Sequence, residues 1–125
     1  MFIVMSNRTH ELLLRNIREV FGENNATRRR AAIEELYTED CVLYVPQGMF
    51  VGHEALDMHA GALRAAHPRS VYTIHSKPHV LHNAGRMAWG SSPPGEPPAQ
   101  TGWDVMIVRD GKIAALYVFL DAMPS

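Results

Sequence analysis

The first half of the chain carries apolar residues at the three- to four-residue spacing of amphipathic helices. We predict three helices there, and their apolar faces are Leu13, Ile17, Val20 and Phe21, then Ile33, Leu36 and Tyr37, then Leu56, Ala60 and Leu63. Residues suited to begin or end helices bound these groups. In chain order they are Ser6 or Asn7, Gly22, Asn25 or Thr27, Gly52 and Pro68.

The second half of the chain contains short and long apolar runs separated by turn residues, a pattern that is typical of β-strands. The predicted strands are residues 41–45, 71–82, 86–92 and a final pair within 102–121, and residues 49–51 are a short strand or a bend. The turns and loops between them are residues 46–48, 83–85, the proline-rich stretch 93–98, and a hairpin turn at Asp110-Gly111. Helices set apart from a run of antiparallel strands indicate an α+β fold.

Both faces of the final strand pair are apolar. By alternation Asp104, Met106 and Val108 share one face, and Trp103 lies on the other. Ile113 and Tyr117 are likewise expected on the face opposite Leu116 in the last strand. One layer of helices covers one face of a sheet, so we predict that a second copy of the chain covers the other, with Trp103 in the interface. Coverage by the chain's own termini is the alternative.

Composition narrows the class of protein further. The 125 residues are expected to form one domain, residues 1–125, with a formal net charge of −1. Neither nucleic acid nor a membrane surface is an expected partner, since no basic excess or apolar span is present. The single cysteine, Cys41, fits a cytoplasmic location, and Arg28-Arg29-Arg30 is expected to be a solvated face.

Asp104 is a lone carboxylate inside an apolar strand. If its face lines a pocket, burial disfavours the charged form and leaves a neutral acid able to donate a hydrogen bond or a proton. A structural acid paired with a histidine or arginine at the pocket mouth is the alternative.

Several short motifs in order resemble one known family. They are residues 36–42 (LYTEDCV), Pro46, residues 52–55 (GHEA), residues 102–105 (GWDV), residues 110–113 (DGKI) and Asp121. In this order the chain resembles the SnoaL-like branch of the NTF2-like superfamily from its first helix to Asp121. The resemblance implies a cone-shaped α+β fold, with a curved antiparallel sheet wrapped around three helices and a pocket between them. Members include polyketide cyclases, ketosteroid isomerases, limonene-epoxide hydrolases, dehydratases and non-catalytic binding domains, so the family implies a shape more than a reaction.

Two known catalytic sets of the superfamily are absent. Asp104-Val105-Met106 matches the ketosteroid isomerase strand whose aspartic acid stays protonated in its apolar site and donates a hydrogen bond to an oxyanion. The resemblance places that enzyme's base at Val45 and its tyrosine near Ile17, so isomerisation by that set is excluded. The acids and the arginine of the epoxide hydrolase set are also missing, with Val118 standing where its last-strand acid would be.

The remaining candidates are single residues with a suitable side chain for a pocket. His75, mid-strand, is a candidate base, and Tyr44, beside Pro46, is a candidate to orient a carbonyl or hydroxyl group. Packing or exposure is the alternative for each. The predicted ligand contacts are Trp89, Met106, His59 and Tyr117. No metal-binding motif is present, and neither a metal nor a cofactor is expected.

Two functions stay open at this point. The first is a cofactor-independent enzyme of the cyclase, isomerase or dehydratase type, acting on a small apolar carbonyl compound. The second is a non-catalytic ligand-binding or dimerisation domain on the same fold. Asp104 discriminates between them, since an exposed or salt-bridged Asp104 would remove the main support for an enzyme.

Overall fold

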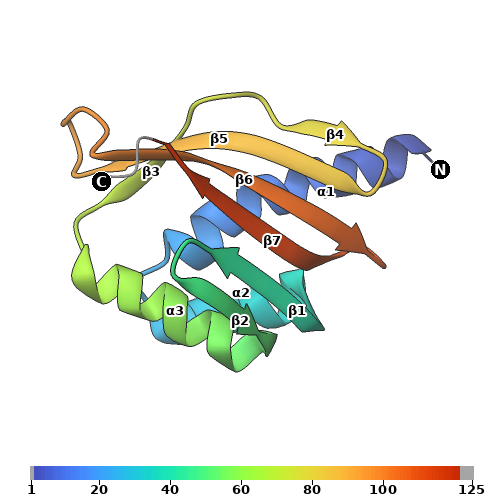
Figure 1. The fold of residues 1–125 in the computed structure, drawn as a ribbon, viewed down its shortest axis with the longest axis horizontal. Helices are drawn as coiled ribbons and strands as arrows, with labels where there is room; N and C mark the ends of the chain where they lie inside the picture. The colour runs from blue at the N-terminus through green and yellow to red at the C-terminus, as the bar shows by residue number, and fades with distance from the viewer. Residues whose placement is uncertain (1, 122–125) are drawn as a thin grey trace.

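The helices lie together on one side of a curved sheet (Figure 1). The computed structural model describes residues 2–121. Helix α1 (Phe2–Arg15) continues into a π-helical segment, η1 (Asn16–Phe21), and is followed by α2 (Ala26–Leu36) and α3 (Gly52–Ala66). As predicted, Gly22 ends the first helical segment, and Asn25 caps α2 by accepting a 2.9 Å hydrogen bond from the Arg28 amide.

Two predicted helix ends are wrong. Helix α1 begins at Phe2 rather than at Ser6 or Asn7. Helix α2 ends at Leu36, because Tyr37 has extended backbone angles and opens the first strand. The side chain of Tyr37 is nevertheless buried, as its place in the apolar pattern predicted.

Seven strands form one sheet. They are β1 (Tyr37–Val45), β2 (Gly48–Val51), β3 (Val71–Ile74), β4 (His79–Leu81), β5 (Ala84–Ser92), β6 (Gln100–Arg109) and β7 (Lys112–Leu120). The order is β2-β1-β7-β6-β5-β3, and β4 also pairs with β5. The hairpin β6–β7 therefore occupies the middle of the sheet. All pairs are antiparallel except β1–β7, so the expected antiparallel sheet is in fact mixed. The hairpin makes β7 antiparallel to β6. The other edge of β7 pairs with β1, which is joined to it through a long stretch of intervening chain and runs parallel to it.

Proline and bulges account for the other differences from the predicted strands. The run 71–82 is two strands, separated by a segment that contains Pro78, which has no amide hydrogen to give to a ladder. Strand β1 begins four residues before Cys41 and passes through an irregularity of register between Tyr37 and Val42. The predicted turn 83–85 is shorter, because β5 already starts at Ala84.

The central hairpin turns at Asp110-Gly111, as predicted. Both residues have positive φ angles, 53° and 74°, as a tight hairpin turn requires. A bulge next to Ile107 shifts the register so that Ile113 pairs with Val108. Ile113 therefore lies in the core with Leu116, and its predicted placement on the face of Tyr117 is wrong.

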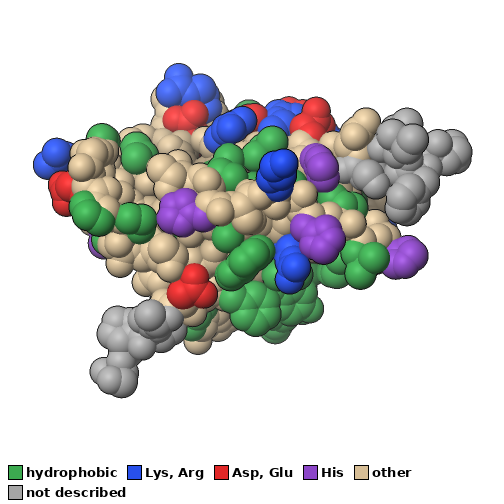
Figure 2. Space-filling view, turned by 90° about the horizontal axis from the view of Figure 1, so that it is seen from above, with side chains coloured by type: hydrophobic (Ala, Val, Ile, Leu, Met, Phe, Trp, Pro, Cys, Tyr) green, Lys and Arg blue, Asp and Glu red, His purple; other side chains and the backbone are tan. Residues whose placement is uncertain are grey.

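The core lies between the helices and the inner face of the sheet. Its largest fully buried side chains are Leu12, Leu13, Val20, Ile33, Leu36, Tyr37, Leu43, Leu56, Met87, Met106, Ile113 and Leu116. The outer face of the sheet is left uncovered by the described residues. Phe119 is 57% exposed there, and Met49, Val51 and Tyr117 are also exposed. Figure 2 shows hydrophobic side chains gathered along the lower edge of its view. A second copy on this outer face remains a prediction.

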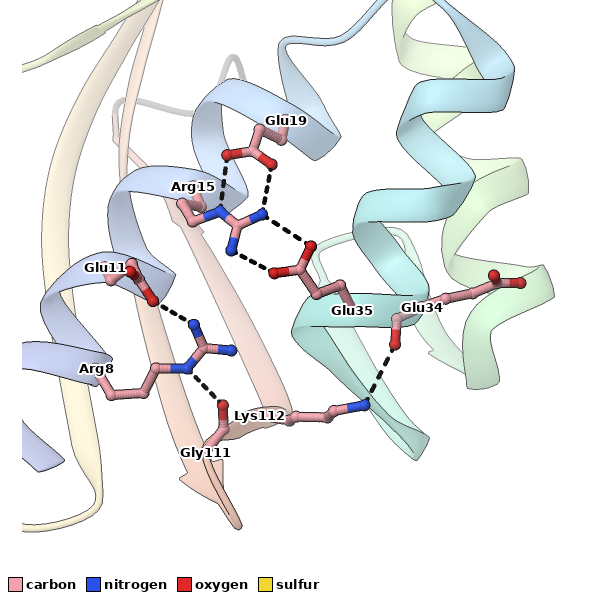
Figure 3. Close-up of polar contacts among 8 residues, drawn as sticks. All are labelled: Arg8, Glu11, Arg15, Glu19, Glu34, Glu35, Gly111 and Lys112. Atoms are coloured by element: carbon pink, nitrogen blue, oxygen red, sulfur yellow. Dashed lines mark hydrogen bonds and ion pairs between the residues drawn. The ribbon is translucent and has the colours of Figure 1, made fainter.

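Ion pairs join α1, η1 and α2 at the surface, and hydrogen bonds join α1 and α2 to the β6–β7 hairpin (Figure 3). The Arg15 guanidinium binds Glu19 and Glu35, and lowers the pKa of the Glu35 carboxyl by hydrogen bonding. Arg8 donates to the Gly111 carbonyl oxygen at 2.8 Å. Pairs this exposed contribute little to stability individually.

The expected solvated face at Arg28-Arg29-Arg30 is wrong for its middle residue. Arg29 is buried and forms a 2.9 Å ion pair with Asp57 of α3, while Arg28 is exposed. This contact links α2 to α3. No helix within residues 2–121 has the length and apolar character needed to cross a membrane.

Candidate functional site

A cavity of about 380 Å³ lies between η1, α3 and the inner face of the sheet. That volume suits a small organic molecule. Its walls are mainly apolar, and the apolar and aromatic side chains include Ile17, Phe21, Leu63, Trp89, Val118 and Leu120. A few polar groups interrupt this surface, so any ligand would be oriented by a small number of hydrogen bonds.

Asp104 of β6 lines this cavity and is buried, with 3% of its surface exposed. The Trp89 indole N–H donates to its Oδ1 at 2.9 Å, and the Asn16 amide donates to its Oδ2 at 3.4 Å. Burial raises the pKa of Asp104 to about 7, against the lowering effect of these two hydrogen bonds. The carboxyl is therefore available as an acid or as a base near neutral pH.

Gly102 allows Trp89 to reach Asp104. Gly102 and Trp89 are opposite each other in the β5–β6 ladder, and a Cβ at position 102 would lie 2.7 Å from the indole ring. A side chain at position 102 would push the indole away from the carboxyl. The glycine of the Gly-Trp-Asp motif thus sets the position of the hydrogen-bond donor.

The π-helical segment presents Asn16 to the same carboxyl. Within it the Gly22 amide donates to the Ile17 carbonyl oxygen, five residues earlier, at 2.9 Å. Widened turns of this kind occur often at functional sites. The buried Tyr37 hydroxyl donates to Asn16 Oδ1, and this directs the Asn16 amide N–H groups toward Asp104. Burial raises the pKa of Tyr37, so its hydroxyl stays protonated.

Asn16 and Tyr37 were not predicted as site residues. The signal for Asn16 was present, because it lies three and four residues after Leu13 and Leu12, inside the apolar stripe of the first helix. A polar residue at such a position needs a buried partner. No pattern in the sequence identified which partner it would have.

Several further polar residues line the cavity, among them His59, Tyr72 and Arg64. His59 of α3 packs against the Phe50 ring, with centroids 4.6 Å apart, and burial lowers its pKa, which keeps the imidazole neutral at pH 7. Tyr72 of β3 meets the edge of Trp89 at 5.5 Å. Arg64 of α3 is buried beside them.

The structure brings together some of the predicted site residues and separates others. Asp104, Trp89 and His59 line the cavity. Met106 is fully buried on the same strand face but does not line it. Tyr44 stacks on Tyr117, with ring centroids 4.4 Å apart, and neither lines the cavity.

The strand alternation explains the displaced tyrosines. In β1 Leu43 and Val45 face inward, so Tyr44 faces outward, and Tyr117 lies opposite it in the β1–β7 ladder. His75 is exposed and contacts the Thr73 hydroxyl at 2.9 Å, away from the cavity. The catalytic roles predicted for His75 and Tyr44 therefore lack the contact with a bound molecule that they require.

The positions where the ketosteroid isomerase and epoxide hydrolase resemblance implies catalytic groups are apolar here, and they line the same cavity. Ile17, Val45 and Val118 are all in its wall. Among the residues that the structure describes, Asp104 is the one carboxylate that lines it. No cluster of three or more histidine, cysteine or acidic side chains within residues 2–121 is placed to hold a metal ion.

A curved sheet closed over three helices, with a cavity at one end of the core, defines a cone-shaped α+β pocket domain. The sequence profile of the SnoaL-like domain matches residues 17–116, and the chain belongs to this family. The predicted family and its cone fold are thereby confirmed. No curated protein matches the chain.

Solved structures with the same fold come from several bacteria. A proposed isomerase of the SnoaL-like family from Agrobacterium tumefaciens has 20% identity and a TM-score of 0.85, covering 93% of this chain and 99% of its own. A proposed SnoaL-like polyketide cyclase from Jannaschia sp. CCS1 has 16% identity and a TM-score of 0.76, covering 92% and 86%. An NTF2-like protein of unknown function from Mesorhizobium loti has 22% identity and a TM-score of 0.69, covering 94% and 93%. At these identities the likeness shows the fold alone.

Proposed function

We propose that this SnoaL-like domain binds a small, mainly apolar carbonyl compound and catalyses a cofactor-independent proton transfer on it, of the cyclase, isomerase or dehydratase type. The observation that carries the proposal is the placement of Asp104. It is a buried carboxyl in an apolar cavity, held by two neutral donors and joined to no cation by an ion pair among the described residues. A carboxyl in such surroundings is suited to act as a neutral hydrogen-bond donor.

The chemistry follows from the groups that line the cavity. The protonated Asp104 carboxyl donates to the carbonyl oxygen of the bound molecule and stabilises the negative charge that forms on it. The neutral His59 imidazole accepts a proton from the carbon next to that carbonyl, and the electron pair of the C–H bond moves to give an enolate. In a compound that carries a carbon–carbon double bond next to the enolate, return of the proton from His59 to the far end of that double bond gives an isomer. Attack of the enolate carbon on a second carbonyl carbon closes a ring, and the alkoxide that forms takes the proton from His59.

His59 replaces His75 and Tyr44 as the assisting group in this proposal. It lines the cavity with Asp104, and its lowered pKa keeps it in the form that accepts a proton. The names of the isomerase from Agrobacterium tumefaciens and the cyclase from Jannaschia describe reactions of this type.

A non-catalytic ligand-binding domain is the second candidate, and one observation favours it. Ile17 and Val45 line the cavity where the ketosteroid isomerase resemblance implies a tyrosine and a base. A cavity that has lost its base retains the ability to bind an oxyanion through Asp104 without moving a proton between carbons.

Titration with 2-naphthol, whose phenolic oxygen mimics an enolate, tests the role of Asp104. We expect Asp104→Asn to weaken binding by roughly 10-fold, since a hydrogen bond to a charged oxygen is lost. Asp110→Asn, a change in the exposed hairpin turn, is the matched control and should leave the affinity unchanged. Equal affinities of the wild type and Asp104→Asn would remove Asp104 from the site.

Deuterium exchange separates the two candidate functions. An enzyme of the proposed type should speed the exchange of the α-protons of 2-tetralone in D₂O, followed by NMR, and His59→Gln should abolish the acceleration. Binding of 2-naphthol without any accelerated exchange of 2-tetralone would support the non-catalytic domain instead.

A further inference from the structure

Arg64, in the last turn of α3, is a buried cation without an acidic partner. Its exposed fraction is 6%, yet it forms no ion pair with any residue in the described part of the chain. Its hydrogen bonds go to neutral oxygens: Nε donates to Asn24 Oδ1 at 2.8 Å, and Nη2 donates to the carbonyl oxygens of Ser70 at 2.9 Å and Pro68 at 3.3 Å. Charges are rarely buried in proteins without a counter-charge, because desolvation is costly.

Arg29 provides a comparison within the same molecule. It is buried to the same degree as Arg64, and its Nε donates at 2.9 Å to Asp57, so its charge is neutralised by the protein itself. Arg29 does not line the cavity, whereas Arg64 does. The buried arginine that lacks a carboxylate is thus the one that faces the space where a ligand would lie.

The neutral contacts of Arg64 hold its guanidinium at one place on the cavity wall. Nε and Nη2 are bound to Asn24 and to the chain that leaves α3, whereas Nη1 makes no hydrogen bond with any residue from 2 to 121. A guanidinium held on one side by neutral acceptors keeps donors for an anion on its other side.

Arg64 and Asp104 lie in the same cavity without touching each other. No hydrogen bond or ion pair joins them in the described structure. Tyr72, also in the cavity wall, is within electrostatic reach of both: burial raises the pKa of its hydroxyl, Asp104 raises it further, and Arg64 lowers it. Because Arg64 and Asp104 line one cavity of about 380 Å³, a single bound molecule is able to meet both groups.

We infer that the ligand of this cavity is an apolar carbonyl compound that also carries a carboxylate, with the carboxylate bound by Arg64 and the carbonyl oxygen directed to Asp104. This inference rests on the proposed function for the carbonyl end, and on Arg64 alone for the acidic end. The ligand's carboxylate supplies the counter-charge that the protein leaves out, and the apolar walls between the two groups cover the body of the molecule.

A matched pair of probes tests the acidic end without reference to Asp104. The probes are 2-naphthoate and its methyl ester, which share the apolar body and differ in charge, and binding to the full chain is measured by calorimetry at low salt. We expect the acid to bind at least roughly 10-fold more tightly than the ester, as a charge-assisted hydrogen bond requires. Equal binding of the two, or binding of neither at millimolar concentration, would overturn the inference, and this comparison needs no variant.

Variants then assign the effect to one residue. Arg64→Gln should reduce the affinity for 2-naphthoate to that for the ester, and Arg64→Lys should restore part of the difference. Arg69→Gln, an exposed arginine five positions along, removes the same charge outside the cavity and should leave both affinities unchanged. A loss in Arg69→Gln equal to that in Arg64→Gln would show a general charge effect and overturn the assignment.

The inference and the proposed function fail in different ways. Asp104→Asn should leave the preference for 2-naphthoate over its ester intact, because that preference comes from Arg64. If this preference is present but 2-naphthol binds Asp104→Asn as tightly as the wild type, the inference that Arg64 binds a carboxylate is supported and the proposed role of Asp104 is wrong. If the 2-naphthol result holds and the acid has no preference, the role of Asp104 stands and the inference about Arg64 fails.

Discussion

Asp104 makes the stability of this protein depend on pH in an unusual direction. Burial raises its pKa from the ordinary value of 3.8 to about 7 in the folded chain. The unfolded chain therefore loses the Asp104 proton at a lower pH than the folded chain does. By proton linkage, the free energy of unfolding falls progressively as pH rises from about 4 to about 7. Above that range the loss due to Asp104 is constant.

The magnitude can be worked from the two pKa values. The pKa values of the folded and unfolded chains differ by about 3. One pKa unit corresponds to 1.36 kcal/mol, so ionised Asp104 lowers the free energy of unfolding by about 4 kcal/mol at high pH. Between pH 5 and pH 8 the part that develops is on the order of 2 to 3 kcal/mol. This is a large share of the free energy of unfolding of a small domain.

Asp104→Asn removes the titration and keeps the shape of the side chain. Urea denaturation of the wild type and the variant at pH 5 and pH 8 gives the free energy of unfolding of each. We expect the wild type to lose on the order of 2 to 3 kcal/mol more than Asp104→Asn over this interval. The control Asp110→Asn, in the exposed turn, should follow the wild type.

A parallel response of the wild type and Asp104→Asn would contradict a raised pKa of Asp104 in the folded chain. It would mean that Asp104 titrates alike in the folded and unfolded chains, and that the carboxyl is ionised at neutral pH. The neutral-donor chemistry assigned to it would then be lost as well. A steeper loss of stability in the variant than in the wild type would contradict the sign.

Two further predictions concern the support of Asp104 and the outer face of the sheet. Tyr37→Phe removes the hydroxyl that holds the Asn16 amide, and should lower the free energy of unfolding by about 1 kcal/mol while weakening 2-naphthol binding; unchanged binding would show that Asn16 is held without it. The predicted dimer should give a mass of two chains in light scattering at micromolar concentration, and Phe119→Lys should give one chain. A wild-type monomer at that concentration would contradict the dimer.

The turns and helix ends that depend on one or two residues could be predicted from the sequence. The turn at Asp110-Gly111, the stop at Gly22 and the cap at Asn25 were predicted because each depends on the backbone preference of one or two residues. Asp104 was identified in the same way, as an acid on an apolar strand face. The bulge that moved Ile113 into the core was not predicted, because a one-residue change of register depends on the packing of neighbouring strands.

The parity of the strands decided which predicted strand residues reached the site. Trp89 of β5 lines the cavity, while Tyr44 of β1 faces away from it. His59 reaches the cavity from helix α3, and His75 follows the end of β3 and lies outside the cavity. Tyr44 was predicted at the pocket mouth because it lies near Pro46, and this part of the backbone does lie at the cavity. The side chain that faces the cavity, however, is that of the neighbouring Val45. One position along a strand is enough to exchange the two faces.

The order of residues was enough to identify a single acid on an apolar strand in a SnoaL-like α+β fold. The surroundings that give this acid its properties come from the tertiary structure. Asn16 lies 88 positions from Asp104 in the chain, and Trp89 lies 15 positions away. Arg64 and its partner Asn24 are 40 positions apart. Desolvation and hydrogen bonding act through distance in space, so the pKa of Asp104 and the unpaired charge of Arg64 exist only once the helices have closed against the sheet.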